Sequence, residues 1–241
     1  MLVLSLVGVL LHLVVDLLSS WEMPLLYPLS SHGYSLDLVW FIDLFIILVS
    51  VGALLWIRAN SRNAAVIAGV ALALFVVYIG FRFYQQRIVV DFVQSEVLSG
   101  NSSALVGVIS PQMGITNWHA VVRQDNGYVV HDVHSCLARR EFAWAEGTHV
   151  VSSQTIRSSS EKEVIAASRD AELVKIFLER ARFPVSFVEK EESGGCRVEW
   201  QDVHLMLAGG VIRGVIVYTD EQGRVMRQRF KLKPELEILR E

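Results

Sequence analysis

Apolar side chains dominate the first 82 residues of the chain and fall in three long runs. The runs cover residues 1–19, 36–56 and 64–81, and the third contains no charged residue before Arg82. A helix needs about 20 mostly apolar residues to cross the hydrocarbon core of a bilayer. The pattern therefore predicts three transmembrane helices. With three spans, the loop at residues 20–35 lies on the same side of the membrane as the rest of the chain.

From residue 83 onward the pattern changes to that of a domain in water. Valines at helical spacing predict that a helix continues over residues 83–97. An Asp-Asn-Gly turn at 125–127, between two alternating segments, predicts a β-hairpin over His119–Arg123 and Tyr128–Val133. A polar linker is expected at 152–160 and an amphipathic helix at 163–182, ended by Pro184. Further strands are predicted at 185–189, 197–207, 211–219 and 224–232.

Charge follows the same division. Residues 1–82 hold three arginines and four acids, while residues 83–241 carry the other 19 Lys and Arg and 21 Asp and Glu. We therefore expect a transmembrane helical domain at 1–82 and a soluble α+β domain at 83–241. The net charge of −3, with no basic run, gives no reason to expect nucleic acid as a partner. Two isolated cysteines, Cys136 and Cys196, allow one disulfide but are more often unpaired.

Ionisable residues inside the apolar runs are the candidate functional residues. A charged group at the centre of a membrane helix costs roughly 3 kcal/mol, so such groups usually mark function. His12 and Asp16 are four positions apart, which places them on one face of a helix. With Asp43 they are candidate ligands of a divalent metal, zinc or manganese, whose bound water is acidic enough to supply hydroxide near neutral pH. The alternative is that His12 and Asp16 hydrogen-bond to each other.

Two aspartates of the second apolar run have different expected roles. Asp37 would lie in the first turn of a helix starting at Leu36, where a carboxylate caps the helix. Asp43 would lie almost two turns further in, which capping does not explain, so it is the better candidate for a ligand or a catalytic carboxylate. A second metal site in the His131-Asp132-Val133-His134 segment is not expected. In a strand His131 faces away from the other two polar residues.

The polar residues of the first half form a recognisable series. It comprises His12-x-x-x-Asp16, Ser19-Ser20, the segment Pro24-Leu25-Leu26-Tyr27-Pro28, and Leu36-Asp37 followed by Asp43. The series resembles the YdjM-like family of membrane-bound metal-dependent hydrolases. Pro111, Asn117-Trp118 and the Ala-Arg-Phe-Pro segment at 181–184 are similar to the appended domain of the same proteins.

The resemblance implies a hydrolase of a bacterial or archaeal inner membrane that acts at the bilayer surface. Its metal ligands would be His12, Asp16 and Asp43, and Asp43 would also serve in catalysis. The spacing of His12 and Asp16 is similar to that in zinc-dependent phospholipases and nucleases, which suggests a phosphoester or lipid-like small-molecule substrate. The oligomeric state is left open.

Three departures from the family pattern support a second hypothesis. The family has an earlier helix bearing two histidines, which is missing before Met1 here. Glu22 stands where glycine is common, and Leu44 follows Asp43 where proline is usual. A hydrolytic metal site generally needs three protein ligands. The alternative function is therefore that of a shortened, non-catalytic relative whose membrane helices anchor a partner-binding domain at 83–241.

Overall fold

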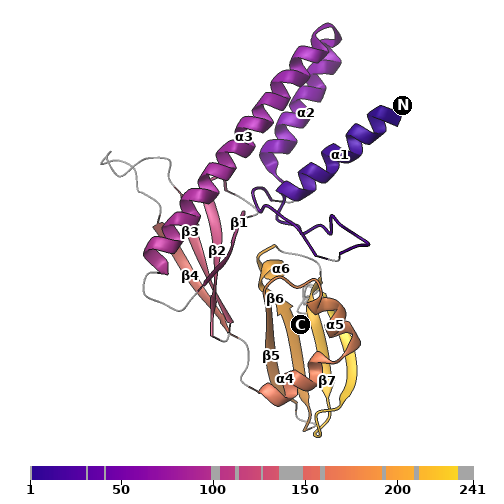
Figure 1. Cartoon of the computed structure of the whole chain (residues 1–241), viewed down its shortest axis with the longest axis vertical. Coiled ribbons are helices and arrows are strands. Elements are labelled where there is room, and N and C mark those ends of the chain that lie inside the picture. The colour runs from indigo at the N-terminus through magenta and orange to yellow at the C-terminus, as the bar shows by residue number, and fades with distance from the viewer. Residues whose placement is uncertain are drawn as a thin grey trace, which may run out of the picture. The chain divides into compact units, whose positions relative to one another are not determined.

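The computed structural model describes the residues in the ranges 2–30, 32–40, 42–98, 104–111, 114–125, 127–135, 149–157, 161–191, 194–208 and 212–232 (Figure 1). The chain divides into two compact units. The first contains residues 1–122 and 131–153, and the second contains residues 123–130 and 154–241. The predicted domain boundary at residue 82 stays a prediction, and one helix continues across it.

The first unit begins with helices. They are α1 (Leu2–Leu18), α2 (Leu44–Ala59), the short η1 (Ser61–Asn63), α3 (Ala64–Phe92) and η2 (Val93–Val97), which extends α3. Because only η1 separates them, α2 and α3 run side by side in opposite directions, as Figure 1 shows. The ring of Phe45 stacks on that of Tyr78, with 4.3 Å between centroids. The predicted helix at 83–97 is confirmed.

The prediction of three transmembrane helices is wrong. Within the described part of the chain, one helix, Ser61–Glu96, is long and apolar enough to cross a membrane. The apolar helices α1 and α2 have 17 and 16 residues. At 1.5 Å per residue each is about 25 Å long, short of the roughly 30 Å of a hydrocarbon core. The sequence reading made the second helix too long because it treated every apolar residue after Leu36 as helical.

The segment 36–40 is extended because it is hydrogen-bonded to the end of α1. The amides of Leu38 and Val39 donate to the carbonyl of Leu18, at 3.0 and 3.1 Å, and the amide of Ser20 donates to the carbonyl of Val39 at 3.0 Å. Leu38 and Val39 are buried against Tyr78. These bonds occupy backbone groups that a helix would otherwise pair internally. The helix α2 therefore starts only at Leu44.

A four-stranded sheet follows, in the order β1 (Ala104–Ile109), β2 (Asn117–Gln124), β3 (Gly127–His134) and β4 (His149–Arg157). The predicted hairpin is confirmed as β2 and β3. The linker predicted at 152–160 is wrong over most of its length, because β4 runs through it. Pairing with a neighbouring strand satisfies the backbone whatever the side chains, so polar residues do not exclude a strand.

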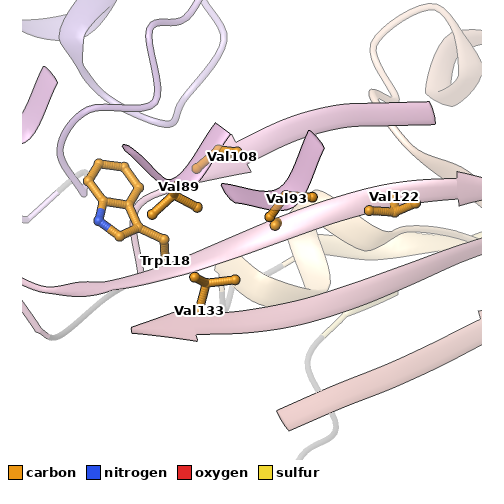
Figure 2. Close-up of a cluster of buried hydrophobic side chains, with 7 residues drawn as sticks. Val89, Val93, Val108, Trp118, Val122 and Val133 are labelled. Atoms are coloured by element: carbon orange, nitrogen blue, oxygen red, sulfur yellow. The ribbon is translucent and has the colours of Figure 1, made fainter. Parts of the chain in front are cut away.

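The end of α3 packs on this first sheet. Val89 and Val93 are fully buried and cluster with Val108, Trp118 and Val133 of the strands (Figure 2). Figure 2 shows the two helical valines pointing toward the strands that carry the other three residues. Burying such side chains stabilises a fold by about 1.5–3 kcal/mol each. The same helix that is apolar enough to cross a membrane thus also forms part of a water-excluding core.

The second unit contains a four-stranded antiparallel sheet. It consists of β5 (Pro184–Lys190), β6 (Cys196–Asp202), β7 (Ile212–Thr219) and β8 (Val225–Leu232), in that order. The helices α4 (Lys162–Arg169) and α5 (Glu172–Leu178) cover one face, and α6 (Val203–Ala208) follows β6. Val174 and Phe177 of α5 pack against Val198, Val215 and Val217 of the strands. The strands predicted in this unit are confirmed.

Cys196 is a free thiol, and Cys136 lies outside the described residues.

Two elements of this unit differ from the prediction. The single helix expected at 163–182 is broken at Ala171, whose ψ of 138° is extended. The strand expected at 197–207 ends at Asp202. The carboxylate of Asp202 accepts from the amides of His204 at 2.9 Å and Phe183 at 3.0 Å. This carboxylate ends the strand and starts α6, in the manner of a helix cap.

Candidate functional site

The predicted pair on α1 is formed. His12 Nε2 lies 3.4 Å from Asp16 Oδ2, as their spacing of four residues requires. The His12 side chain is 75% exposed and that of Asp16 is 34% exposed. At the end of the same helix, the Ser19 hydroxyl donates to the backbone carbonyl of Asp16 at 2.7 Å. His12 and Asp16 thus form a contact on the surface of the last turns of α1, and the roles expected for them stay predictions.

Asp43 caps α2. Its Oδ1 accepts from the amides of Phe45 at 3.0 Å and Ile46 at 3.1 Å, and its Oδ2 accepts from the hydroxyl of Tyr78 at 2.7 Å. An N-cap carboxylate stabilises a helix by about 1 kcal/mol. Both oxygens of Asp43 are thus engaged with α2 and α3, and the capping role expected of Asp37 belongs to Asp43.

Asp37 lies outside the helix and interrupts the extended segment with a left-handed residue. Its φ is 56°, a left-handed conformation that aspartate tolerates better than most residues. The residue is buried, its Oδ1 accepts from the Ser35 hydroxyl at 3.0 Å, and its carbonyl accepts from the amide of Ser110 at 3.3 Å. Asp37 therefore stabilises a turn that is hydrogen-bonded to Ser110, the residue after β1.

The implied metal can be tested against these contacts. No group of three or more His, Cys, Asp or Glu side chains in the part of the chain that the structure describes is placed to hold a metal ion. His12 and Asp16 offer two donors, and the oxygens of Asp43 are bonded to an amide pair and a hydroxyl. The residues present do not fit a three-ligand site. A metal held by His12, Asp16 and Asp43 stays a prediction.

A different residue organises this region. Arg82, at the end of the uncharged stretch of α3, is only 1% exposed. Its Nε donates to the carbonyl of Leu38 at 2.9 Å, and its other nitrogens donate to the carbonyl of Ile115 and the hydroxyl of Ser110. The guanidinium lies over the ring of Trp118, 4.1 Å from its centroid. One side chain thus joins α3, the extended segment and the residues around β1 and β2.

Neighbouring amides extend this junction. Gln86 donates to the carbonyls of Leu36 at 2.9 Å and Val108 at 3.2 Å. Gln85 is 1% exposed, and both polar atoms of its side chain lack a hydrogen-bond partner among the described residues, as does Trp118 Nε1. Sequence reasoning treated Arg82 only as the end of an apolar run. The available signal was the series Arg82, Gln85 and Val89, which recurs at the spacing of one helix face.

The outer face of the hairpin carries a second polar group. His119 Nδ1 and Asp132 Oδ1 are 2.6 Å apart, and His134 Nδ1 lies 2.8 Å from Asn117 Oδ1. These contacts join residues that face each other across β2 and β3, as expected for cross-strand pairs. The expectation that His131, Asp132 and His134 form no second metal site stays a prediction.

The helical part of the chain resembles a known type of membrane sequence. Residues 1–89 match the YdjM inner membrane protein family. The resemblance carried by the His12–Asp16 series is thereby confirmed for α1, α2 and most of α3. The YdjM match stops at Val89, so it does not cover the strands. No curated protein and no solved structure matches the chain. The match supports a membrane location for the helical part.

Proposed function

We propose that the chain is an integral membrane protein that anchors the partner-binding β5–β8 sheet of its second unit to the inner membrane. The observation that carries the proposal is that the two ends of α3 have different surroundings. The first part of this helix presents apolar side chains outward, while its last turns are buried against a sheet. The match of residues 1–89 to an inner membrane family supports the same location.

The outward surface of α3 suits lipid. Leu72 and Val76 are 61% and 65% exposed, and no charged residue occurs between Asn63 and Arg82. Monomeric proteins in water rarely expose apolar patches of this extent. All backbone groups inside a helix are paired, so this element can lie in hydrocarbon without cost from unsatisfied amides.

The other end of α3 holds the β strands. Arg82 donates to the carbonyl of Leu38, and Gln86 donates to the carbonyls of Leu36 and, within β1, Val108. Val89 and Val93 lie in the core against β2 and β3. If α3 left the sheet, its buried valines would be exposed and several backbone carbonyls would lose their hydrogen-bond donors. The first sheet is therefore held at the membrane by the same helix that would cross it.

Membrane extraction tests the proposal. Full-length chain in isolated membranes should resist washing with alkaline carbonate, which removes peripheral proteins. Leu72→Arg with Val76→Arg should shift most of it to the supernatant, because each arginine at a helix centre costs about 3 kcal/mol on insertion scales. The matched control is Leu72→Ile with Val76→Ile. If wild-type chain is washed off with the arginine variant, the proposal fails.

A second candidate function is metal-dependent hydrolysis of a phosphoester or lipid-like substrate, and it is favoured by one observation. His12 and Asp16 are juxtaposed at 3.4 Å on α1, inside the matched range. Imidazole and carboxylate together suit zinc or manganese. A further ligand would have to join them from outside the described residues or from a second copy.

Metal analysis of the detergent-purified chain tests this candidate. Stoichiometric zinc or manganese should be present in the wild type and lost in both His12→Ala and Asp16→Ala. The variant His32→Ala, which changes a loop histidine, is the matched control. Phosphoesterase activity would be assayed only in metal-loaded protein. Absence of metal from the wild-type chain would contradict hydrolysis by this route.

A further inference from the structure

β8 is an edge strand of the second sheet and is rich in basic residues. β8 is the last strand in the order β5-β6-β7-β8, so β7 is its one strand neighbour among the described residues (Figure 1). Residues 227–231 pair with 214–218 in five successive, regular positions, with irregularities at both ends. An exposed edge of this kind presents a row of backbone amides and carbonyls to any further strand.

Side chains of β8 differ between its two faces. On one face Gln228 accepts from the amide of Leu173 at the start of α5, so this is the face that the helices cover. Phe230, two positions along, lies on the same face and is 41% exposed. Arg227, Arg229 and Lys231 alternate with these residues and lie on the opposite face.

The positive charge of that face is only partly neutralised. Lys231 is paired with Glu199, which also binds Arg197 at 3.1 Å, and Arg197 binds Glu189 at 2.9 Å. Arg229 donates to the hydroxyl of Tyr218 at 3.3 Å. In the described ranges no carboxylate lies within ion-pair distance of Arg227 or Arg229, and both side chains are exposed. Two uncompensated arginines therefore flank the open edge.

We propose that the open edge of β8 binds an acidic segment of a partner protein as an added antiparallel or parallel strand. Main-chain hydrogen bonds would supply affinity, as in other β-strand additions. Alternate acidic residues would meet Arg227 and Arg229, and the apolar residues between them would meet Phe230. The inference rests on the proposed function, because it names the class of partner that the anchored unit binds.

An anionic bilayer is a poorer fit to the same surface. Each basic residue near an anionic membrane strengthens binding only by roughly fivefold, and two arginines fall short of the clusters of about four to eight that mark lipid-binding segments. A bilayer also offers no partner for the edge amides. Pairing of β8 with a second β8 would bring arginines together, and such charges on edge strands normally prevent it.

A peptide-binding measurement tests the proposal. The probe is a fluorescent eight-residue peptide of alternating glutamate and valine, added to the detergent-purified full chain and followed by anisotropy. Binding should be saturable. It should weaken at least about tenfold in the variant Arg227→Glu with Arg229→Glu, because the charge complementarity is reversed. The matched control, Arg180→Glu with Lys190→Glu, makes the same change of charge on exposed residues elsewhere in the unit and should bind normally.

Two further probes separate strand addition from simple charge attraction. The same peptide with every backbone amide N-methylated keeps its charge but cannot donate along either of its edges, and it should bind at least about tenfold more weakly. Vesicles containing phosphatidylserine should not displace the unmodified peptide. Equal binding of the N-methylated peptide, displacement by vesicles, or no binding by wild type would each overturn the proposal. Carbonate resistance of the Arg227→Glu, Arg229→Glu variant should be unchanged, so failure here is distinct from failure of membrane anchoring.

Discussion

The helices of the first unit and the sheet of the second unit distribute polarity in opposite ways. Along α3, leucines and valines such as Leu72 and Val76 face outward, while Arg82 and Gln85 are buried. In the β5–β8 sheet, Val198, Val215 and Val217 are fully buried, and Arg227 and Arg229 face outward. The same two kinds of side chain thus exchange places between the two regions.

The two arrangements suit different solvents. Burial of apolar surface drives folding only where the alternative is water. A helix in lipid gains nothing by burying leucine, so its specific contacts come from polar groups and close packing. The inverted pattern of α3 is therefore an independent indication of a membrane environment, beside its length.

Removal of Arg82 should have the largest effect. In Arg82→Ala the carbonyls of Leu38 and Ile115 and the hydroxyl of Ser110 lose their donor. At about 1–3 kcal/mol for each buried group left unpaired, the free energy of unfolding should fall by about 3 kcal/mol or more. Unfolding by denaturant in detergent, followed by tryptophan fluorescence, measures it. Arg87→Ala, an exposed arginine five residues on, is the control and should cost about 0.5 kcal/mol.

Matched valine truncations should separate the two regions directly. Val198→Ala removes two buried carbon groups from the second unit and should cost about 2 kcal/mol, including the cavity. Val76→Ala makes the same change on the outward face of α3, where Val76 is 65% exposed, and should cost less than about 0.5 kcal/mol. Equal losses in the same unfolding assay would mean that the outward face of α3 is packed against protein.

Loss of the Asp43 carboxylate should have an intermediate effect. Asp43→Ala removes the cap of α2 and leaves the hydroxyl of Tyr78 without its acceptor, so a loss of about 1–2 kcal/mol is expected. Asp43→Asn keeps an oxygen for the cap and should recover most of it. A double-mutant cycle with Tyr78→Phe should show coupling between the two residues. Full stability of Asp43→Ala would exclude the capping role.

The smallest effect should be a dependence of stability on pH through His131. Burial lowers the pKa of His131 on β3, and the neighbouring Asp132 opposes this only in part. The unfolded chain therefore binds a proton more readily than the folded chain. Stability should be complete above the ordinary value of about 6.5 and should fall as the pH drops through it. His131→Asn should remove this component from a series of unfolding curves between pH 5 and 8.

Local signals in the sequence were sufficient for much of the β region. The Asp-Asn-Gly turn predicted the β2–β3 hairpin, and alternation predicted the strands from Pro184 onward. These patterns report contacts between residues close in the chain. Residues 152–157 were predicted to be a linker but lie in β4. Formation of this strand depends on pairing with a neighbouring strand, which its own composition does not reveal.

The helical region was predictable in its chemistry but less so in its geometry. His12 and Asp16 meet as their spacing requires. The start of α2 was placed eight residues too early, since nothing local reveals that Leu38 and Val39 bond to the end of α1. That error assigned to Asp37 the capping role that Asp43 has. The partners of Arg82 come from residues 38, 110 and 115, and such distant contacts leave no periodic trace in the sequence.

One mechanical consequence follows from the unbroken helix α3. Successive residues of a helix are turned by about 100° about its axis, so a twist of one position would carry Arg82 away from all three of its acceptors and Val89 out of its core. A rotation of α3 about its axis therefore requires the first sheet to rotate with it. Any torque applied to α3 would therefore be transmitted to β2 and β3.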